Sequence, residues 1–156
     1  MITTAKRLAK TLAGSKTNDA IARAMGNIDW ERLDPTDDDT MALMARGLVG
    51  SPAELGLGLR HNLDQVIALT SLREGARKQQ ALAATAQLLW RQMAQVFELI
   101  PEMAHCDDED FDLYVHQGLR GLCLVLEQDD QQRAAEHLWD EVDELDPEAD
   151  VQWGET

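Results

Sequence analysis

Residues 105–112, with the sequence HCDDEDFD, place one histidine, one cysteine and five carboxylates within eight positions. Residues of these types fit four roles: a metal site, a cluster of catalytic carboxylates, a helix start stabilised by negative charge, or an acidic surface for a basic partner. The spacing of the surrounding residues and the elements expected to carry them distinguish these roles.

A divalent metal site would draw its ligands from the region around this segment. Asp112 and His116 are four residues apart and would share one face of a helix, and the thiolate of Cys106 would favour zinc. No CxxC or HxxxH motif accompanies them, and the remaining histidines lie far away in the sequence. One Glu-x-x-His motif occurs, at 102–105, whereas a carboxylate-bridged di-iron bundle carries it on two helices. The sequence therefore predicts neither a metal nor a cofactor.

A catalytic role would use carboxylates further along the chain. Asp108, Glu109 and Asp112, followed by Glu127 and Asp130, resemble the EExxE...ExxD magnesium-binding pattern of the all-α nucleotide pyrophosphatases of the MazG type. The resemblance implies magnesium ions that bridge a triphosphate and activate water. Aspartate replaces glutamate at the first and last positions of the first motif, and one continuous helix would separate Asp112 from Glu127 by about 22 Å. Such an enzyme is therefore the alternative function. No GxGxxG, GxxxxGK[ST] or GxSxG motif is present.

Charge is distributed unevenly along the chain, whose net charge is -15. Residues 1–28 hold five basic groups against one aspartate, and residues 29–40 hold six acids against one arginine. Residues 41–100 are nearly balanced, whereas 101–156 hold eighteen acids against Arg120 and Arg133. Clustered like charge opposes folding by self-repulsion, which favours a role in solubility or in binding a cationic partner.

Length and composition predict one folded domain in the cytoplasm. The chain has 156 residues, of which 44% are hydrophobic, enough for a single buried core. No run reaches the roughly 18 uncharged apolar residues of a membrane span, and the N-terminus lacks the apolar stretch of a signal peptide. Cys106 and Cys123 are too few for a disulfide framework and are expected to be free thiols.

The apolar pattern predicts an all-α fold. Apolar residues recur at intervals of three and four and no segment alternates like a strand, which indicates a single-domain helical bundle of about six to seven helices over 1–146. A flexible acidic tail is expected over 147–156. Short helices are expected at 4–13 and 18–25, and Thr36 is expected to cap the next helix, which should end near residues 47–50. Helix starts are also expected at the capping-box sequences SPAE, 51–54, and SLRE, 71–74.

Heptad spacing predicts how the longest helices pack. A central helix over about 72–99 carries an apolar seam of Leu82, Ala86, Leu89, Met93, Val96 and Ile100. A helix over about 108–127 carries a second seam of Phe111, Val115, Gly118, Leu122 and Val125, and Gly118 with Gly121 would let two backbones approach closely. We expect these helices to form an antiparallel hairpin. A last helix over about 131–145, capped by Asp129 or Asp130, should turn Ala134, Leu138, Val142 and Leu145 inward.

The carboxylates of the last third exceed what helix capping requires. The residues expected to bind a partner are Asp107, Asp108, Glu109, Asp110, Asp129, Asp130, Glu136, Asp140, Asp143 and Glu144. On a helix, acids three and four residues apart lie about 5–6 Å from one another, comparable to neighbouring phosphates.

In size and charge the chain resembles DNA mimics and the anti-CRISPR and anti-restriction proteins of mobile genetic elements. We expect a non-enzymatic inhibitor that docks on a basic surface of a nucleic-acid-handling protein complex, without direct contact with nucleic acid or membrane. A homodimer and a small acidic chaperone or adaptor remain open alternatives.

Overall fold

The computed structural model describes residues 37–98 and 107–145, and within these residues it is helical and contains no strand. The helices are α3 (Asp38–Val49), α4 (Glu54–Leu69), α5 (Ala76–Glu98), α6 (Asp108–Gln128) and α7 (Gln132–Glu144). The predicted all-α class is confirmed. The predicted total of six to seven helices includes those at 4–13 and 18–25, which, like the predicted tail at 147–156, lie outside the described residues. None of the described helices combines the length and the apolar character needed to cross a membrane.

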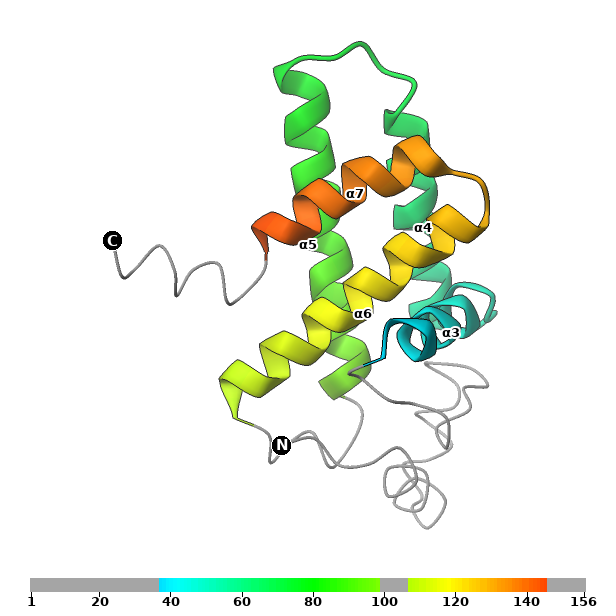
Figure 1. The fold of residues 1–156 in the computed structure, drawn as a ribbon, viewed down its shortest axis with the longest axis vertical. Helices are drawn as coiled ribbons and strands as arrows, with labels where there is room; N and C mark the ends of the chain where they lie inside the picture. Colours follow the sequence, from blue (N-terminus) through cyan, green and yellow to red (C-terminus); the bar gives the residue numbers. More distant parts are fainter. Residues whose placement is uncertain (1–36, 99–106, 146–156) are drawn as a thin grey trace, which may run out of the picture.

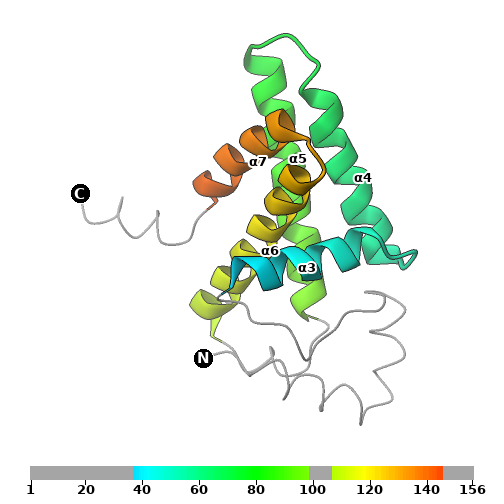
Figure 2. The same ribbon diagram turned by 45° about the vertical axis from the view of Figure 1, so that its right-hand side comes forward.

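Helices α4 and α5 form an antiparallel pair joined by a loop at one end, and α6 and α7 cross this pair obliquely (Figures 1 and 2). Helix α6 contacts α3, α5 and α7, and its contact with α3 is the most extensive in the fold. The antiparallel hairpin predicted between the helices at 72–99 and 108–127 is not confirmed. The antiparallel neighbour of α5 is α4, because the loop between them is short enough to turn the chain straight back.

The predicted apolar seams face the core. On α5, Leu82, Ala86, Leu89, Met93 and Val96 are buried; on α6, Val115, Gly118, Leu122 and Val125 are buried and Phe111 is half-buried. Ile100 lies outside the described residues.

The two glycines of α6 allow two different close contacts. A Cβ on Gly121 would lie 2.4 Å from the backbone oxygen of Met41, so this glycine lets the backbone of α3 approach. A Cβ on Gly118 would lie 2.6 Å from Cγ of Met93, so this one makes room for a side chain of α5. The close backbone approach predicted from these glycines therefore involves α3 rather than α5.

Several helix ends follow the local signals in the sequence. The side chain of Asp107 accepts a hydrogen bond from the backbone N–H of Asp110 at 2.8 Å and caps α6. Asp37, rather than the predicted Thr36, caps α3 through the N–H of Thr40. Helix α4 begins at Glu54, within SPAE, and α3 ends at Val49. These ends were predictable to within one or two residues.

The starts of α5 and α7 differ from the prediction. Helix α5 begins at Ala76, because Gly75 has φ +153°, a conformation that a helix cannot contain. The loop before it is held by Lys78, whose buried ammonium donates to the carbonyl oxygens of Thr70 and Leu72. Helix α7 has no side-chain cap, and Asp130 adopts a left-handed conformation with φ 59° instead of capping it.

Candidate functional site

The carboxylates predicted to bind a partner are exposed, apart from Asp110, which is half-buried. They fall into three groups: Asp107 to Asp110 at the start of α6, Asp129 and Asp130 at its end, and Glu136, Asp140, Asp143 and Glu144 on α7. Because α6 has 21 residues, its two ends are about 32 Å apart. The predicted residues therefore do not form one compact patch.

The two groups on α6 have structural partners of their own. Asp107 caps the helix, and Oδ1 of Asp129 lies 3.0 Å from Nη2 of Arg46 on α3. Within the described residues, none of the carboxylates of α7 forms an ion pair, although the charge of Asp143 acts on Arg120 of α6.

The α7 group borders a cleft of about 520 Å³ between α7, the first turns of α5 and the preceding loop, which we call the α5–α7 cleft. Leu82 and His137 contribute to its wall, and no lysine or arginine of the described residues lines it. The carboxylates that line it are Glu74, Asp140, Glu141, Asp143 and Glu144. Two of these carboxylates were not predicted from the sequence to belong to the site. Glu74 was expected at a helix start. Glu141 could have been predicted, because it lies three residues before Glu144 and so on the same side of the helix.

The electrostatics of the α5–α7 cleft reflect crowding of like charge. The pKa of Glu141 is raised, first by partial burial and then by the negative charges of Glu144 and Asp140. The pKa of Glu74 is lowered, mainly by its hydrogen bond from the ammonium of Lys78 at 2.6 Å. Among the described residues, Glu74 is the carboxylate of this cleft that forms an ion pair, with Lys78, and Asp143 interacts electrostatically with Arg120. The cleft therefore keeps a net negative charge.

Arg120 on α6 contacts Asp38 and Trp139, and it also interacts electrostatically with Asp143 of the cleft. Nη2 of Arg120 lies 2.9 Å from Oδ2 of Asp38, and its Cζ lies 5.0 Å from the ring centroid of Trp139. The adjacent Asp38 carboxylate raises the pKa of this arginine, and the indole N–H of Trp139 donates to Glu127 at 3.0 Å. Residues 107–145 hold thirteen acids against Arg120 and Arg133, so the charge of this part of the protein is strongly negative.

The groups considered for metal or catalytic chemistry are separated. Among residues 37–98 and 107–145, no group of three or more histidine, cysteine or acidic side chains has the arrangement to hold a metal ion. Nε2 of the buried His116 is hydrogen-bonded to the carbonyl oxygen of Val142 at 3.2 Å. Helix α6 is continuous, so Asp112 and Glu127 lie about 22 Å apart along its axis. His105 and Cys106 lie outside the described residues.

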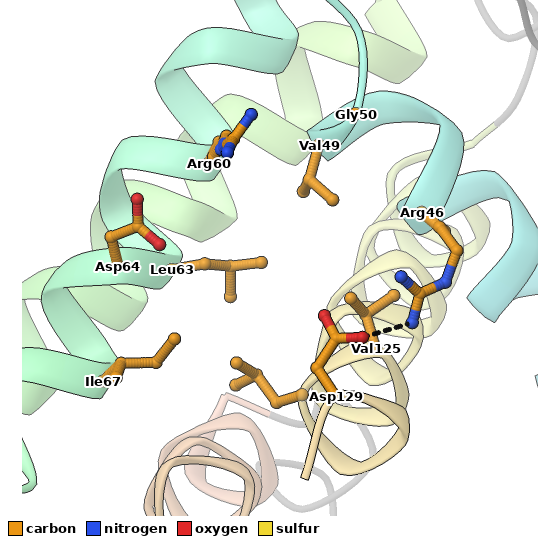
Figure 3. Close-up of a pocket in the computed structure, with 10 residues that line it drawn as sticks. Arg46, Val49, Gly50, Arg60, Leu63, Asp64, Ile67, Val125 and Asp129 are labelled. Carbon is orange, nitrogen blue, oxygen red and sulfur yellow. Dashed lines mark hydrogen bonds and ion pairs between the residues drawn. The ribbon is translucent and has the colours of Figure 1, made fainter. Parts of the chain in front are cut away.

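A second cleft, of about 330 Å³, lies between the end of α3, one face of α4 and the end of α6 (Figure 3). Its floor is apolar, with Leu63 and Val125 among the lining side chains. Arg46 is paired with Asp129 on one wall, and Arg60 and Asp64 stand on the wall formed by α4. Since both signs of charge are present at its rim, this cleft does not select a cationic partner.

Comparison with known proteins gives no relative: no family model, no curated protein and no solved structure matches the chain.

Proposed function

We propose that this protein is a non-enzymatic acidic binding module that docks on a basic surface of a nucleic-acid-handling protein complex, as an inhibitor of the DNA-mimic or anti-CRISPR type, in the cytoplasm. The supporting observation is the α5–α7 cleft, which five carboxylates line and to which no described lysine or arginine contributes. The pyrophosphatase and the chaperone or adaptor remain alternative proposals that no feature of the site favours.

Crowded carboxylates favour a cationic ligand. The raised pKa of Glu141 shows that its ionisation is opposed by burial and by its negative neighbours Glu144 and Asp140. A lysine or arginine from a partner would relieve that repulsion with its charged head, while its aliphatic stem lay against the wall around Leu82. Binding should then lower the pKa of Glu141 and release protons in mildly acidic solution.

The same charge distribution would govern association kinetics. An excess of exposed carboxylates on α7 attracts a basic surface over roughly one Debye length, about 8–10 Å at physiological ionic strength. Association with such a surface is expected to be fast and to weaken strongly as salt is added. This behaviour fits an inhibitor that competes with nucleic acid for a basic groove.

Charge reversal on α7 tests the proposal. In the triple variant Asp140→Lys, Glu141→Lys and Glu144→Lys, affinity for an octalysine peptide, measured by calorimetry at low salt, should fall by between about threefold and a hundredfold, because up to three ion pairs of roughly 0.2–1 kcal/mol each are lost. The helical circular dichroism spectrum should be unchanged, since Asp140 and Glu144 are exposed and Glu141 is only partly buried.

A matched control separates the site from bulk charge. Glu54→Lys, Asp64→Lys and Glu98→Lys change the net charge equally at exposed positions of α4 and α5 that do not line the α5–α7 cleft. This control should retain most of the affinity for octalysine. Equal losses in the two triple variants would contradict a specific site on α7.

The acidic start of α6 is tested separately. The set Asp108→Lys, Glu109→Lys and Asp110→Lys leaves Asp107 in place, because removing that cap would cost about 1 kcal/mol of helix stability. A loss of affinity as large as that of the α7 variant would extend the docking surface to this end of α6. Magnesium-dependent hydrolysis of nucleoside triphosphates by the purified protein would instead support the pyrophosphatase alternative.

A further inference from the structure

The side of α5 that faces away from α7 is exposed from the first turn of the helix to the last. Among the described helices α5 contacts α4, α6 and α7, and α6 and α7 cross it on one side (Figure 1). Leu82, which lines the α5–α7 cleft, is buried on that side. At about 100° of rotation per residue, the opposite side carries a row of exposed residues, which we call the α5 stripe: Arg77, Ala84, Gln87, Leu88, Arg91 and Glu98.

The charge of the α5 stripe contrasts with that of the rest of the protein. The whole chain has a net charge of -15, whereas α5 contains a single acid, Glu98, and three basic residues. Within the described residues, Arg77, Arg91 and Glu98 form no ion pair. Two copies of the chain would therefore meet with little charge repulsion along this stripe, but with strong repulsion at α6 and α7.

The charges at the two ends of α5 oppose the helix dipole. Arg77 lies in the first turn and Glu98 is the last residue, and the helix has no acid in its first turn and no base in its last. The dipole favours the reverse arrangement, so both charges are placed unfavourably within the isolated chain. An opposite charge beside each of them would offset this effect.

The order of residues along the α5 stripe is self-complementary. If two α5 helices pack antiparallel about a twofold axis between positions 87 and 88, Arg77 of each copy lies opposite Glu98 of the other. Leu88, which is 45% exposed in one chain, then lies at the centre opposite Gln87 and loses contact with water. Because each stripe supplies both members of the ion pairs, the contact closes at two copies.

We propose that this protein forms a symmetric homodimer through the α5 stripe, with α5 of one copy antiparallel to α5 of the other. The α5–α7 cleft of each copy stays open, because Leu82 in its wall lies on the opposite side of the helix. A partner would then meet two acidic surfaces in one assembly, which strengthens its binding where it reaches both. The dimer does not depend on the proposed docking function and is tested without a partner.

Sedimentation equilibrium of the full-length protein at physiological ionic strength tests the dimer. Because one helix face is a small interface, the association should be weak and reversible, with the mean mass rising towards that of two chains between about 10 μM and 1 mM. The mass of one chain throughout this range would overturn the proposal. Growth beyond two copies would also overturn it, because a twofold contact closes.

Charge reversal at the ends of the stripe identifies the interface. Arg77→Glu and Glu98→Arg should each weaken dimerisation by about five- to a hundredfold, because two ion pairs are replaced by two like-charge contacts. Both substitutions agree with the helix dipole, so α5 should stay folded. An equimolar mixture of the two variants should dimerise like the parent, because a carboxylate of one variant then faces a guanidinium of the other at both ends.

Matched substitutions separate the interface from net charge. Arg60→Glu and Asp64→Arg change the net charge by the same amounts at exposed positions of α4 that line the second cleft. Each should dimerise like the parent. Equal weakening by Arg60→Glu and Arg77→Glu, or a mixture of the two α5 variants that stays monomeric, would overturn the proposed interface.

Discussion

Replacing Lys78 by methionine tests how the loop between α4 and α5 is held in shape. The side chain is 1% exposed, and its ammonium donates to the carbonyl oxygens of Leu72 at 3.3 Å and Thr70 at 3.4 Å, and to Glu74 at 2.6 Å. Methionine keeps an unbranched stem of similar length but provides no donor. The substitution therefore removes the polar contacts of the loop while largely preserving the packing.

The expected loss follows from the two carbonyl contacts. Both hydrogen bonds are long, so each should contribute about 0.5–1 kcal/mol to the free energy of unfolding. Lys78→Met should therefore lower the free energy of unfolding by about 1–2 kcal/mol. Lys78→Ala also removes three methylene groups at about 0.8 kcal/mol each, which brings its loss to about 3–4 kcal/mol. Relief of the cost of burying an ammonium acts in the opposite direction in both variants.

Urea unfolding followed by circular dichroism measures these differences. An unchanged slope of the unfolding free energy against urea concentration would show that the same surface area is exposed on unfolding. A methionine variant at least as stable as the parent would refute the reasoning, because the free-energy cost of burying the ammonium would then equal or exceed the stabilisation from its hydrogen bonds.

The pH dependence of stability adds a second check. Lys78 lowers the pKa of Glu74 below its ordinary 4.5, so the stabilisation by this pair is complete above that value and is lost as the pH falls through the lowered pKa. The difference between parent and methionine variant should therefore narrow in acid.

The remaining predictions concern packing, thiol reactivity and pH. Gly121→Ala would place a methyl group 2.4 Å from a backbone oxygen of α3 and should lower the free energy of unfolding by about 1–3 kcal/mol. Gly118→Ala would meet the flexible side chain of a methionine and should lower it by less. Equal urea midpoints of the two variants would contradict this difference. Burial raises the pKa of Cys123, so in native Cys106→Ser protein its thiol should not react with a disulfide reagent until urea unfolds the chain, and rapid labelling of the native protein would contradict its burial. Since the folded-state pKa of Glu141 is raised, its ionisation opposes folding at neutral pH; Glu141→Gln should raise the urea midpoint at pH 7 and lose that advantage in acid, and a lowered midpoint at pH 7 would count against it.

Features of the fold set by neighbouring residues were predictable from the sequence. Spacings of three to seven residues determine the helical class, the inward seam of α5 and the cap at Asp107, and such spacings can be read directly from the sequence. The outward placement of Glu136, Asp140, Asp143 and Glu144 follows from the same periodicity and is confirmed by their exposure.

Features that depend on the relative placement of helices were not predictable in this way. The seams of α5 and α6 are compatible with a hairpin, but the short loop pairs α5 with α4 and leaves α6 to cross over them. The α5–α7 cleft likewise depends on where α7 crosses α5, so Glu74 and Glu141, 67 positions apart, meet only in the folded chain. At 71–74, a capping-box spacing was outweighed by the backbone of Gly75 and the contacts of Lys78.

The extensive packing of α3 on α6 has a consequence for how the chain folds. Its ion pairs join residues far apart in the sequence, 82 positions between Asp38 and Arg120 and 83 between Arg46 and Asp129. Closing a loop of that length carries an entropic cost of about 4 kcal/mol before any contact is made, so folding should be slow for a helical protein of this size. During synthesis at about 5–20 residues per second, the apolar face of α3 would stay without its partner α6 for several seconds, whereas α4 and α5 could already pair.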